Sequence, residues 1–130
     1  MEPTAALPAT GSPLPILFVN FHGTLGGGQV HLLTLLDGLD RSRFTPHIVC
    51  CEEGPFAEAL RKRALHPTLI SFGKGKRRYL FTAVPAMFKI HRLLKTLGIR
   101  VVHVSGLQEA KLTAYAAKWA KVPMVWVVAP

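Results

Sequence analysis

The feature that most restricts the fold of this chain is an apolar run that leads through a glycine-rich turn into a helical pattern. Residues 15–21 are mostly apolar without strict alternation, as in a strand buried on both faces of a parallel sheet. The next seven residues contain four glycines, and apolar residues then return at near-helical spacing over residues 29–39. This order predicts the start of an α/β domain.

The same alternation continues along the rest of the chain. Further strands are expected at residues 47–52, 67–72, 100–104 and 123–129, and further helices at 55–64, 83–97 and 107–120. Five strands that alternate with four helices predict the α/β class, with a Rossmann-like, three-layer domain around a parallel sheet of about five strands. Residues 1–14, which include three prolines, are expected to form a flexible lead-in, and residues 15–130 the domain.

The composition fits a folded domain without a membrane span. Apolar residues make up 49% of the 130 residues, but no apolar run is long enough to cross a bilayer, and the first 13 residues lack the apolar stretch of a signal peptide. Cys50 and Cys51 are adjacent in an expected strand, so their side chains should point to opposite faces, reduced and buried, without a disulfide between them. We therefore expect a cytoplasmic protein.

The chain is strongly basic, with 16 Lys and Arg against 7 Asp and Glu and a formal net charge of +9. Such a charge attracts anions, including phosphorylated substrates, acidic lipids and nucleic acid. No helix-turn-helix pattern, zinc-ligand spacing or aromatic-basic RNA motif is visible, so we expect neither a nucleic-acid partner nor a bound metal.

Part of the charge is concentrated after the third expected strand. A basic loop holds Lys74, Lys76, Arg77 and Arg78, and the polar side of the following helix carries Lys89, Arg92 and Lys95. These side chains are candidates for contact with an acceptor or with an anionic membrane, where each cation contributes about 1 kcal/mol. A solvated helix face explains the same pattern, so both interpretations stay open.

The turn after the first strand holds the candidate binding residues Gly26, Gly27, Gly28 and Gln29. Glycines between a strand and a helix let a ligand approach the backbone, and free N–H groups at a helix start favour an anion such as phosphate. In open α/β sheets, ligands bind at the carboxyl ends of strands where the strand order reverses, and this turn should lie there. The segment is neither a P-loop nor G-x-G-x-x-G, because His31 replaces the third glycine, so an ordinary tight turn is the alternative.

In order and spacing, these segments resemble the N-terminal domain of family-4-like retaining glycosyltransferases, from residue 15 to the end. Four segments carry the resemblance: Gly26-Gly27-x-Gln29-x-His31, Glu53-Gly54-Pro55-Phe56, Arg100-Val-Val-His-Val104 and Val122-Pro123. The third of these is similar to the Asp-Val-Val-His-x-His strand of that family.

The resemblance implies the N-terminal half of a B-type fold, in which two Rossmann-like domains move a sugar from a nucleotide-sugar donor to an acceptor. The nucleotide sugar is then a substrate, and no cofactor is implied. The glycines Gly26 and Gly27 would lie against the donor phosphates and the acceptor. Gln29 and His31 match by position, and a binding role and a helix-capping role are open for each. His103, inside the fourth strand, is expected to be a buried structural histidine.

Three positions depart from the family pattern. Ala129 stands where many members have a histidine that faces the transferred sugar, so the catalytic residue is unknown. Arg100 replaces an acid, and Ser105 replaces a second histidine. The donor-binding domain, with its glutamate pair, is absent from residues 1–130, and these residues alone are therefore expected to be inactive, as a fragment or as one chain of a split enzyme.

Two other functions fit the same residues. Glu52 follows the second strand and could hold a ribose hydroxyl, as in an NAD-dependent oxidoreductase, although the glycine pattern is incomplete. A non-catalytic partner of a split transferase would explain Ala129. The function we expect first is the N-terminal half of a cytoplasmic glycosyltransferase, peripheral on the inner face of a membrane.

Overall fold

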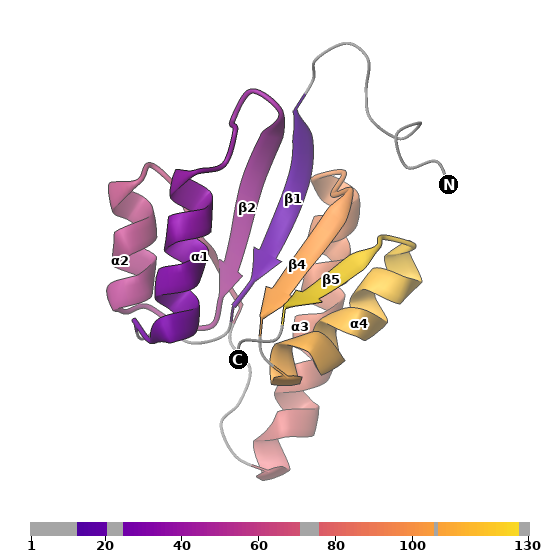
Figure 1. Cartoon of the computed structure of the whole chain (residues 1–130). Coiled ribbons are helices and arrows are strands. Elements are labelled where there is room, and N and C mark those ends of the chain that lie inside the picture. The colour runs from indigo at the N-terminus through magenta and orange to yellow at the C-terminus, as the bar shows by residue number, and fades with distance from the viewer. Residues whose placement is uncertain (1–12, 21–24, 71–75, 106, 128–130) are drawn as a thin grey trace.

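The computed structural model describes residues 13–20, 25–70, 76–105 and 107–127, and for residues 76–82 and 107–109 it describes the backbone only. The chain folds into a three-layer α/β domain (Figure 1). The strands are β1 (Leu14–Val19), β2 (Phe44–Cys50), β3 (Thr68–Leu69), β4 (Val101–Ser105) and β5 (Met124–Val127). The helices are α1 (Gly27–Asp37), α2 (Pro55–Lys62), α3 (Lys76–Thr96) and α4 (Leu107–Ala120).

The sheet is parallel throughout, with the strand order β3-β2-β1-β4-β5. β1 is central, and its Phe18 is paired with Ile48 of β2 on one side and with His103 of β4 on the other. The chain runs from β1 to β2 and β3 and then crosses over to β4, so the strand order reverses between β1 and β4. The predicted Rossmann-like class is confirmed, and this topology places the ligand-binding edge at the carboxyl ends of β1 and β4.

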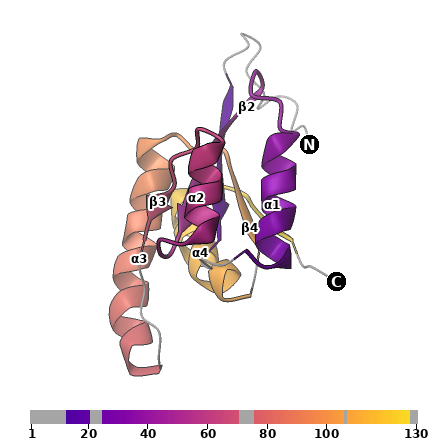
Figure 2. The ribbon, with the colours of Figure 1, turned by 90° about the vertical axis from the view of Figure 1, so that its left-hand side faces the viewer.

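Each face of the sheet has its own apolar core, because successive side chains of a strand point to opposite faces. Leu17 and Val19 pack with α3 and α4, whereas Phe18 packs with α1 and α2. Figure 2 shows α1 and α3 on opposite sides of the sheet. None of these three side chains is more than 2% exposed, and burial of a side chain of this size stabilises the fold by about 1.5–3 kcal/mol. Because β1 contributes side chains to both cores, it must be apolar at successive positions.

The two cysteines follow the same rule. Cys50 packs in the α1/α2 core, Cys51 lies against the α3/α4 core, and both are free thiols. Burial raises the pKa of Cys50 to about 11, which keeps this thiol protonated. Cys51 is only partly buried, against the prediction, because it follows the end of β2.

Two strands differ in extent from the sequence prediction. β2 begins at Phe44, three residues earlier than expected, because Phe44 pairs with Leu14 and the Leu14 N–H donates to the Arg43 carbonyl at 2.8 Å. β3 contains only Thr68 and Leu69, and both are exposed. The expected residues 71 and 72 lie outside the described part of the chain.

Two helices also begin earlier than predicted. α1 starts at Gly27, and its buried side is formed by Gln29, Leu32, Leu33 and Leu36. Val30, one of the apolar residues that suggested a helix over residues 29–39, is therefore exposed. α3 starts at Lys76, so the segment 76–78 that was expected in a basic loop is helical.

Three helices end with a residue in the left-handed backbone region. The φ angles are 63° at Gly98 after α3, 59° at Ala64 after α2 and 60° at Lys121 after α4. In each case the next N–H donates back to a carbonyl of the last helical turn, at 2.9 to 3.0 Å. This is the Schellman motif, in which glycine is favoured because it has no Cβ. Gly98 directly follows the expected helix 83–97, whereas Ala64 and Lys121 adopt this conformation despite their side chains.

Candidate functional site

The candidate site lies at the carboxyl edge of the sheet, where the strand order reverses. Asn20 directly follows β1, Ser105 is the last residue of β4, and Gly26 is the N-cap residue of α1. The Asn20 N–H donates to the Val49 carbonyl of β2 at 2.9 Å, which ties the end of β1 to its neighbour. The glycine turn is thus anchored to the strands that the topology indicates.

A chain of side-chain hydrogen bonds connects these residues. Gln29 Nε2 donates to Asn20 Oδ1 at 2.9 Å, and Asn20 Nδ2 donates to Ser105 Oγ at 3.4 Å. At the other end, the Gly26 N–H donates to Gln29 Oε1 at 3.0 Å. Asn20 is 1% exposed and Gln29 is 6% exposed, so both amides have left water and depend on these partners. The network fixes the start of α1 against the ends of β1 and β4.

Gln29 caps α1 from inside the protein. Gly26 has no side chain with which to cap the helix, and among the described residues Gln29 provides the side-chain hydrogen bond at this end, the reciprocal half of a capping box. Both ends of its amide are engaged within the protein, as the capping alternative requires. The backbone N–H of Gln29 has no partner among the described residues and can still bind a ligand.

The first turn of α1 presents backbone donors toward the carboxyl edge. Val30 is the first residue of the helix whose N–H bonds back, to the Gly26 carbonyl at 3.0 Å. The N–H groups of Gly27, Gly28 and Gln29 therefore have no partner among the described residues. The helix dipole adds partial positive charge here, and the first turn contains no acidic residue. The arrangement favours an anionic group.

Two of the three glycines are not required by the fold. A Cβ added to Gly27 or Gly28 would meet no atom within 4 Å, and neither residue has a left-handed φ. At Gly26, by contrast, a Cβ would lie 3.0 Å from Gln29 Oε1 and would disturb the cap. The conformation of the turn therefore requires glycine at position 26, whereas Gly27 and Gly28 leave the N-terminus of α1 uncovered by side chains.

His103 lies in β4, where it is paired with Phe18 of β1. Its ring packs against Phe18, with the centroids 5.1 Å apart. Burial lowers the pKa of His103 below its ordinary value of 6.5, and the charge of His31 lowers this pKa further. This packing agrees with the expected structural histidine, but the side chain is only partly buried. A neutral imidazole near pH 7 follows from the lowered pKa.

The start of α2 contributes a fixed carboxylate. Arg61 Nη1 and Nη2 donate to the two carboxylate oxygens of Glu53, each at 2.7 Å, and this hydrogen bonding lowers the pKa of Glu53. The pair holds the segment before Pro55, the first residue of α2. Glu52, the candidate for a ribose contact, is exposed just after β2.

Several predicted site residues cannot be placed. Lys74 and Ala129 lie outside the described residues, and only the backbone is described for Lys76, Arg77 and Arg78. Among the side chains that the structure describes, no group of three or more His, Cys, Asp and Glu could hold a metal ion.

Sequence reasoning missed Asn20. It was taken as part of an apolar strand, yet its amide is the centre of the polar network. The available signal was a single polar residue in an apolar run that leads into a glycine turn. Its partner Gln29 was found through its position in the motif alone.

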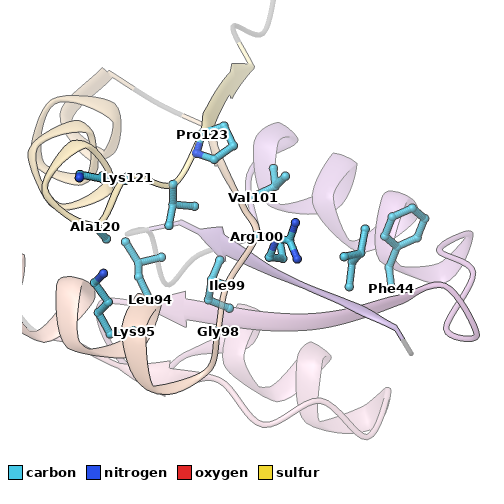
Figure 3. Close-up of a pocket in the computed structure, with 12 residues that line it drawn as sticks. Phe44, Leu94, Lys95, Gly98, Ile99, Arg100, Val101, Ala120, Lys121 and Pro123 are labelled. Atoms are coloured by element: carbon cyan, nitrogen blue, oxygen red, sulfur yellow. The ribbon is translucent and has the colours of Figure 1, made fainter. Parts of the chain in front are cut away.

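A large hollow lies at the opposite edge of the sheet and is separate from this site (Figure 3). It has a volume of about 800 Å³ and is lined by residues at the amino ends of the strands, including Leu14, Phe44, Val101 and Pro123. Ligands of open α/β sheets bind at the other edge, so we do not assign this hollow to the site.

A comparison with protein families settles the affiliation. The model of a family described as Glycosyltransferase Family 4 matches residues 25–128, which include the glycine turn. The chain belongs to glycosyltransferase family 4. The resemblance stated from the motifs is confirmed. No curated protein matches the chain.

Solved structures show the fold of this family-4 domain. MurG of Acinetobacter baumannii is 17% identical with a TM-score of 0.74, over 89% of this chain and 35% of its own. HepE of Anabaena in complex with UDP and glucose is 17% identical with a TM-score of 0.68, over 87% and 29%. A glycosyltransferase of Rickettsia africae is 20% identical with a TM-score of 0.66, over 88% and 29%. The family-4 chain therefore spans about a third of the length of these three proteins.

Proposed function

We propose that the chain is the acceptor-side domain of a glycosyltransferase that uses a nucleotide-sugar donor. The observation that supports this most is the bare first turn of α1. An added Cβ at Gly27 or Gly28 would meet open space, and neither residue has a left-handed φ, so the turn itself does not require glycine there. Glycine at both positions is better explained by the close approach of a ligand. The family assignment and the fold agree with a glycosyltransferase domain.

The chemistry of this turn suits a phosphate group. Backbone N–H groups of Gly27, Gly28 and Gln29 are fixed in direction by the helix and by the buried Gln29–Asn20 hydrogen bond. When a sugar leaves its nucleotide, negative charge develops on the departing phosphate, and fixed N–H donors stabilise that charge. The same donors would serve a phosphorylated acceptor. We assign no catalytic residue.

We further propose that transfer requires a donor-binding domain beyond residues 1–130, in the same polypeptide or in a partner chain. This chain covers only 35% of MurG and 29% of HepE. HepE is described in complex with UDP and glucose, which supports a nucleotide sugar as the donor here. We propose no cofactor. The location we propose is cytoplasmic and peripheral on the inner face of a membrane, with Lys74, Lys76, Arg77 and Arg78 near the acceptor or the lipid.

The test is a titration of the ¹⁵N-labelled chain with UDP, UDP-glucose and, as comparison ligand, NADH. Chemical-shift changes should centre on the amides of Gly27 and Gly28 for the UDP ligands. Gly27→Val should abolish these changes, because its branched side chain covers the helix end. The matched control is Val30→Ser, on the exposed side of the same helix, which should bind like the parent.

Two results would contradict the proposal. A stronger response to NADH than to UDP at the same amides would favour the oxidoreductase alternative. Unchanged UDP binding by Gly27→Val would remove the glycine turn from the site and favour a non-catalytic role. The expected absence of transfer by residues 1–130 is checked separately, by a hydrolysis and transfer assay with UDP-glucose.

A further inference from the structure

The hollow at the amino edge of the sheet, here named the amino-edge hollow, has the size and lining of a small-molecule site. It lies where α3 and α4 end and where the chain enters β1, β2, β4 and β5 (Figure 3). Its volume of about 800 Å³ falls within the range of ligand pockets, roughly 300–1,000 Å³. The carboxyl edge, with the glycine turn, is at the other end of the strands.

The floor and walls of the amino-edge hollow are apolar. Leu94, Ile99 and Ala120 form its floor and are 2%, 4% and 7% exposed, and Phe44 and Val122 are half-buried in its walls. Since the floor is already out of water, an apolar ligand would cover it without displacing polar contacts. The walls would lose further contact with water when a hydrocarbon chain binds, which is favourable.

The rim of the hollow is positively charged. Lys95, Arg100 and Lys121 belong to the lining and are exposed, and none of the twelve lining residues is acidic. Figure 3 shows Lys95 and Lys121, from the ends of α3 and α4, on one side of the hollow and Phe44 on the other. The hollow therefore has a cationic end and an aromatic end.

Lys121 stands at this rim although its backbone favours glycine. Its φ is 60°, in the left-handed region, where a Cβ is unfavourable. The comparable end of α3 has Gly98, with a φ of 63°. A lysine in place of glycine costs stability at this position, and it adds an ammonium group to the rim of the hollow. This is a second observation, independent of the shape of the hollow, that points to a bound anion.

The two helix ends at the rim do not cancel this charge. The Ile99 N–H donates to the Leu94 carbonyl at 3.0 Å, and the Val122 N–H donates to the Ala117 carbonyl at 2.9 Å. These carbonyl groups are thus occupied within the protein. The full charges of the two lysines exceed the partial negative charge of a helix C-terminus, so the potential at this end favours an anion.

We propose that the amino-edge hollow binds a small amphiphilic anion, which consists of one hydrocarbon chain and one carboxylate or phosphate head. The head lies between Lys95 and Lys121, and the chain runs over Leu94 and Ile99 toward Phe44. The match is one of charge and of polarity, because the cations are at one end of an otherwise apolar cavity. Fatty acids and alkyl phosphates share this chemistry.

The lining disfavours the other occupants of such a cavity. A sugar or a nucleotide would bring several hydroxyl groups and ring nitrogens to a surface whose polar side chains are cations alone, so many of these groups would lose water without a partner. A second copy that docked on the same hollow across a two-fold axis would place Lys95 and Lys121 near their own counterparts, and like charges repel.

The amino-edge hollow is independent of the glycine turn. β1 begins with Leu14 at the hollow and ends before Asn20 at the candidate site, so a ligand in the hollow does not reach the turn. The inference goes beyond the proposed transferase function, and neither depends on the other. Both can be followed in one sample, because their amides belong to different residues.

The test is a titration of the ¹⁵N-labelled chain with octanoate and octyl phosphate, each below its micelle concentration. The amides of Gly98, Ile99 and Val122 should shift and saturate, whereas those of Gly27 and Gly28 should not move. Nuclear Overhauser contacts should join the terminal methyl group of the ligand to the Phe44 ring. The tighter of the two ligands identifies the head as a carboxylate or a phosphate. Octanol and acetate, which lack the head or the chain, should bind far more weakly.

Charge reversal tests the cationic end. Lys95→Glu/Lys121→Glu should weaken octanoate binding about tenfold, because two attractions become repulsions. The matched control is Lys89→Glu/Lys111→Glu, which makes the same change in net charge at two exposed lysines of α3 and α4 outside the lining. It should bind like the parent. Circular dichroism melts check that both variants keep the fold.

A second variant tests the cavity itself. Val122→Phe keeps the wall apolar but places a ring in the hollow, so it should abolish the octanoate shifts. If this variant lost its fold, Phe44→Ser, which shortens the wall at the other end, would serve the same purpose with a several-fold loss of affinity. Full binding by a folded Val122→Phe or by Phe44→Ser would overturn the site.

Three further results would also contradict the proposal. Equal binding of octanol and octanoate would remove the anionic head. Octanoate shifts centred on Met87 and Ala114 would move the ligand to the hollow between α3 and α4, which these residues line. Shifts of Gly98 and Val122 that depend on protein concentration without ligand would assign the amino-edge hollow to a second copy. None of these results would affect UDP binding at the glycine turn, which is recorded in the same spectra.

Discussion

The side chain of Gln29 donates a hydrogen bond to the side chain of Asn20 across 2.9 Å, in the interior beneath the glycine turn. Nine residues separate the two in sequence, and the turn of the candidate site lies between them. Since Gln29 is buried, removal of the Asn20 amide takes away the acceptor of the Gln29 Nε2 hydrogen bond. The pair thus links the stability of the domain to the position of its anion-binding N–H groups.

The first prediction concerns this pair. Asn20→Leu should lower the free energy of unfolding by about 1–3 kcal/mol, the usual cost of an orphaned buried polar group. Asn20→Leu combined with Gln29→Leu should cost less than the sum of the single changes, because the second change removes the orphaned amide. Urea denaturation measures both effects. Strict additivity would show that the two side chains do not support each other.

The second prediction compares two glycines of the turn, Gly26 and Gly27. Gly27→Ala should stabilise the domain slightly, by up to about 1 kcal/mol, since alanine favours the helix and its Cβ meets open space. Gly26→Ala should be neutral or destabilising, because its Cβ would lie 3.0 Å from Gln29 Oε1. Thermal melts compare the two. If Gly27→Ala were as damaging as Gly26→Ala, glycine at position 27 would be a structural requirement.

Much of the fold can be predicted from the sequence because the strands contribute side chains to two cores, one on each face of the sheet. Phe18 and its neighbours Leu17 and Val19 face opposite helix layers, so an unbroken apolar run predicts a central strand before any contact is known. Gly98 could be predicted as a helix end because glycine fits a left-handed φ, here 63°. The order of strands and helices then gives the parallel topology.

What could not be predicted depends on partners distant in sequence. From side-chain polarity alone, Val30 would be expected on the buried side of α1 and Gln29 on the exposed side. The structure shows the reverse, and the hydrogen bond from Gln29 to Asn20 makes the burial of Gln29 favourable. β2 starts at Phe44 because Leu14 is there to pair with it. The exposure of Phe88 and Trp119 was also not predicted, since large apolar side chains in a helix normally indicate burial.

The third prediction concerns acid stability. Burial lowers the pKa of both His47 and His103 below the ordinary 6.5. At pH values between the ordinary and the lowered pKa, the unfolded chain binds protons that the folded chain does not bind. The free energy of unfolding therefore falls as pH falls through this range. Urea denaturation from about pH 8 to about pH 5.5 should show the slope, and His103→Gln should reduce it. Stability that rises toward acid over this range would refute the assignment.

The pH range of that experiment lies above the range in which the carboxylates titrate. Hydrogen bonds from Arg63, Ser42 and Arg61 lower the pKa of Asp37, Asp40 and Glu53 respectively. Their contributions are present above the ordinary carboxyl pKa and are lost only at more acidic pH. A change in slope above that region therefore reports on the histidines.

The last prediction compares two helix ends of the same geometry. Ala64 and Gly98 have nearly equal φ angles, 59° and 63°, and each is followed by an N–H that donates back into its helix at 3.0 Å. A side chain in this region costs about 1–2 kcal/mol relative to glycine, because Cβ crowds the following carbonyl oxygen. Ala64→Gly should therefore stabilise the domain, with part of the gain lost to the greater chain entropy of glycine when unfolded. Gly98→Ala should destabilise it, and no neighbouring atom within 4 Å adds a steric term, so the effect isolates the backbone. Opposite shifts of the melting temperature are expected, and shifts in the same direction would mean that the ends of α2 and α3 differ in a way that their shared φ does not reveal.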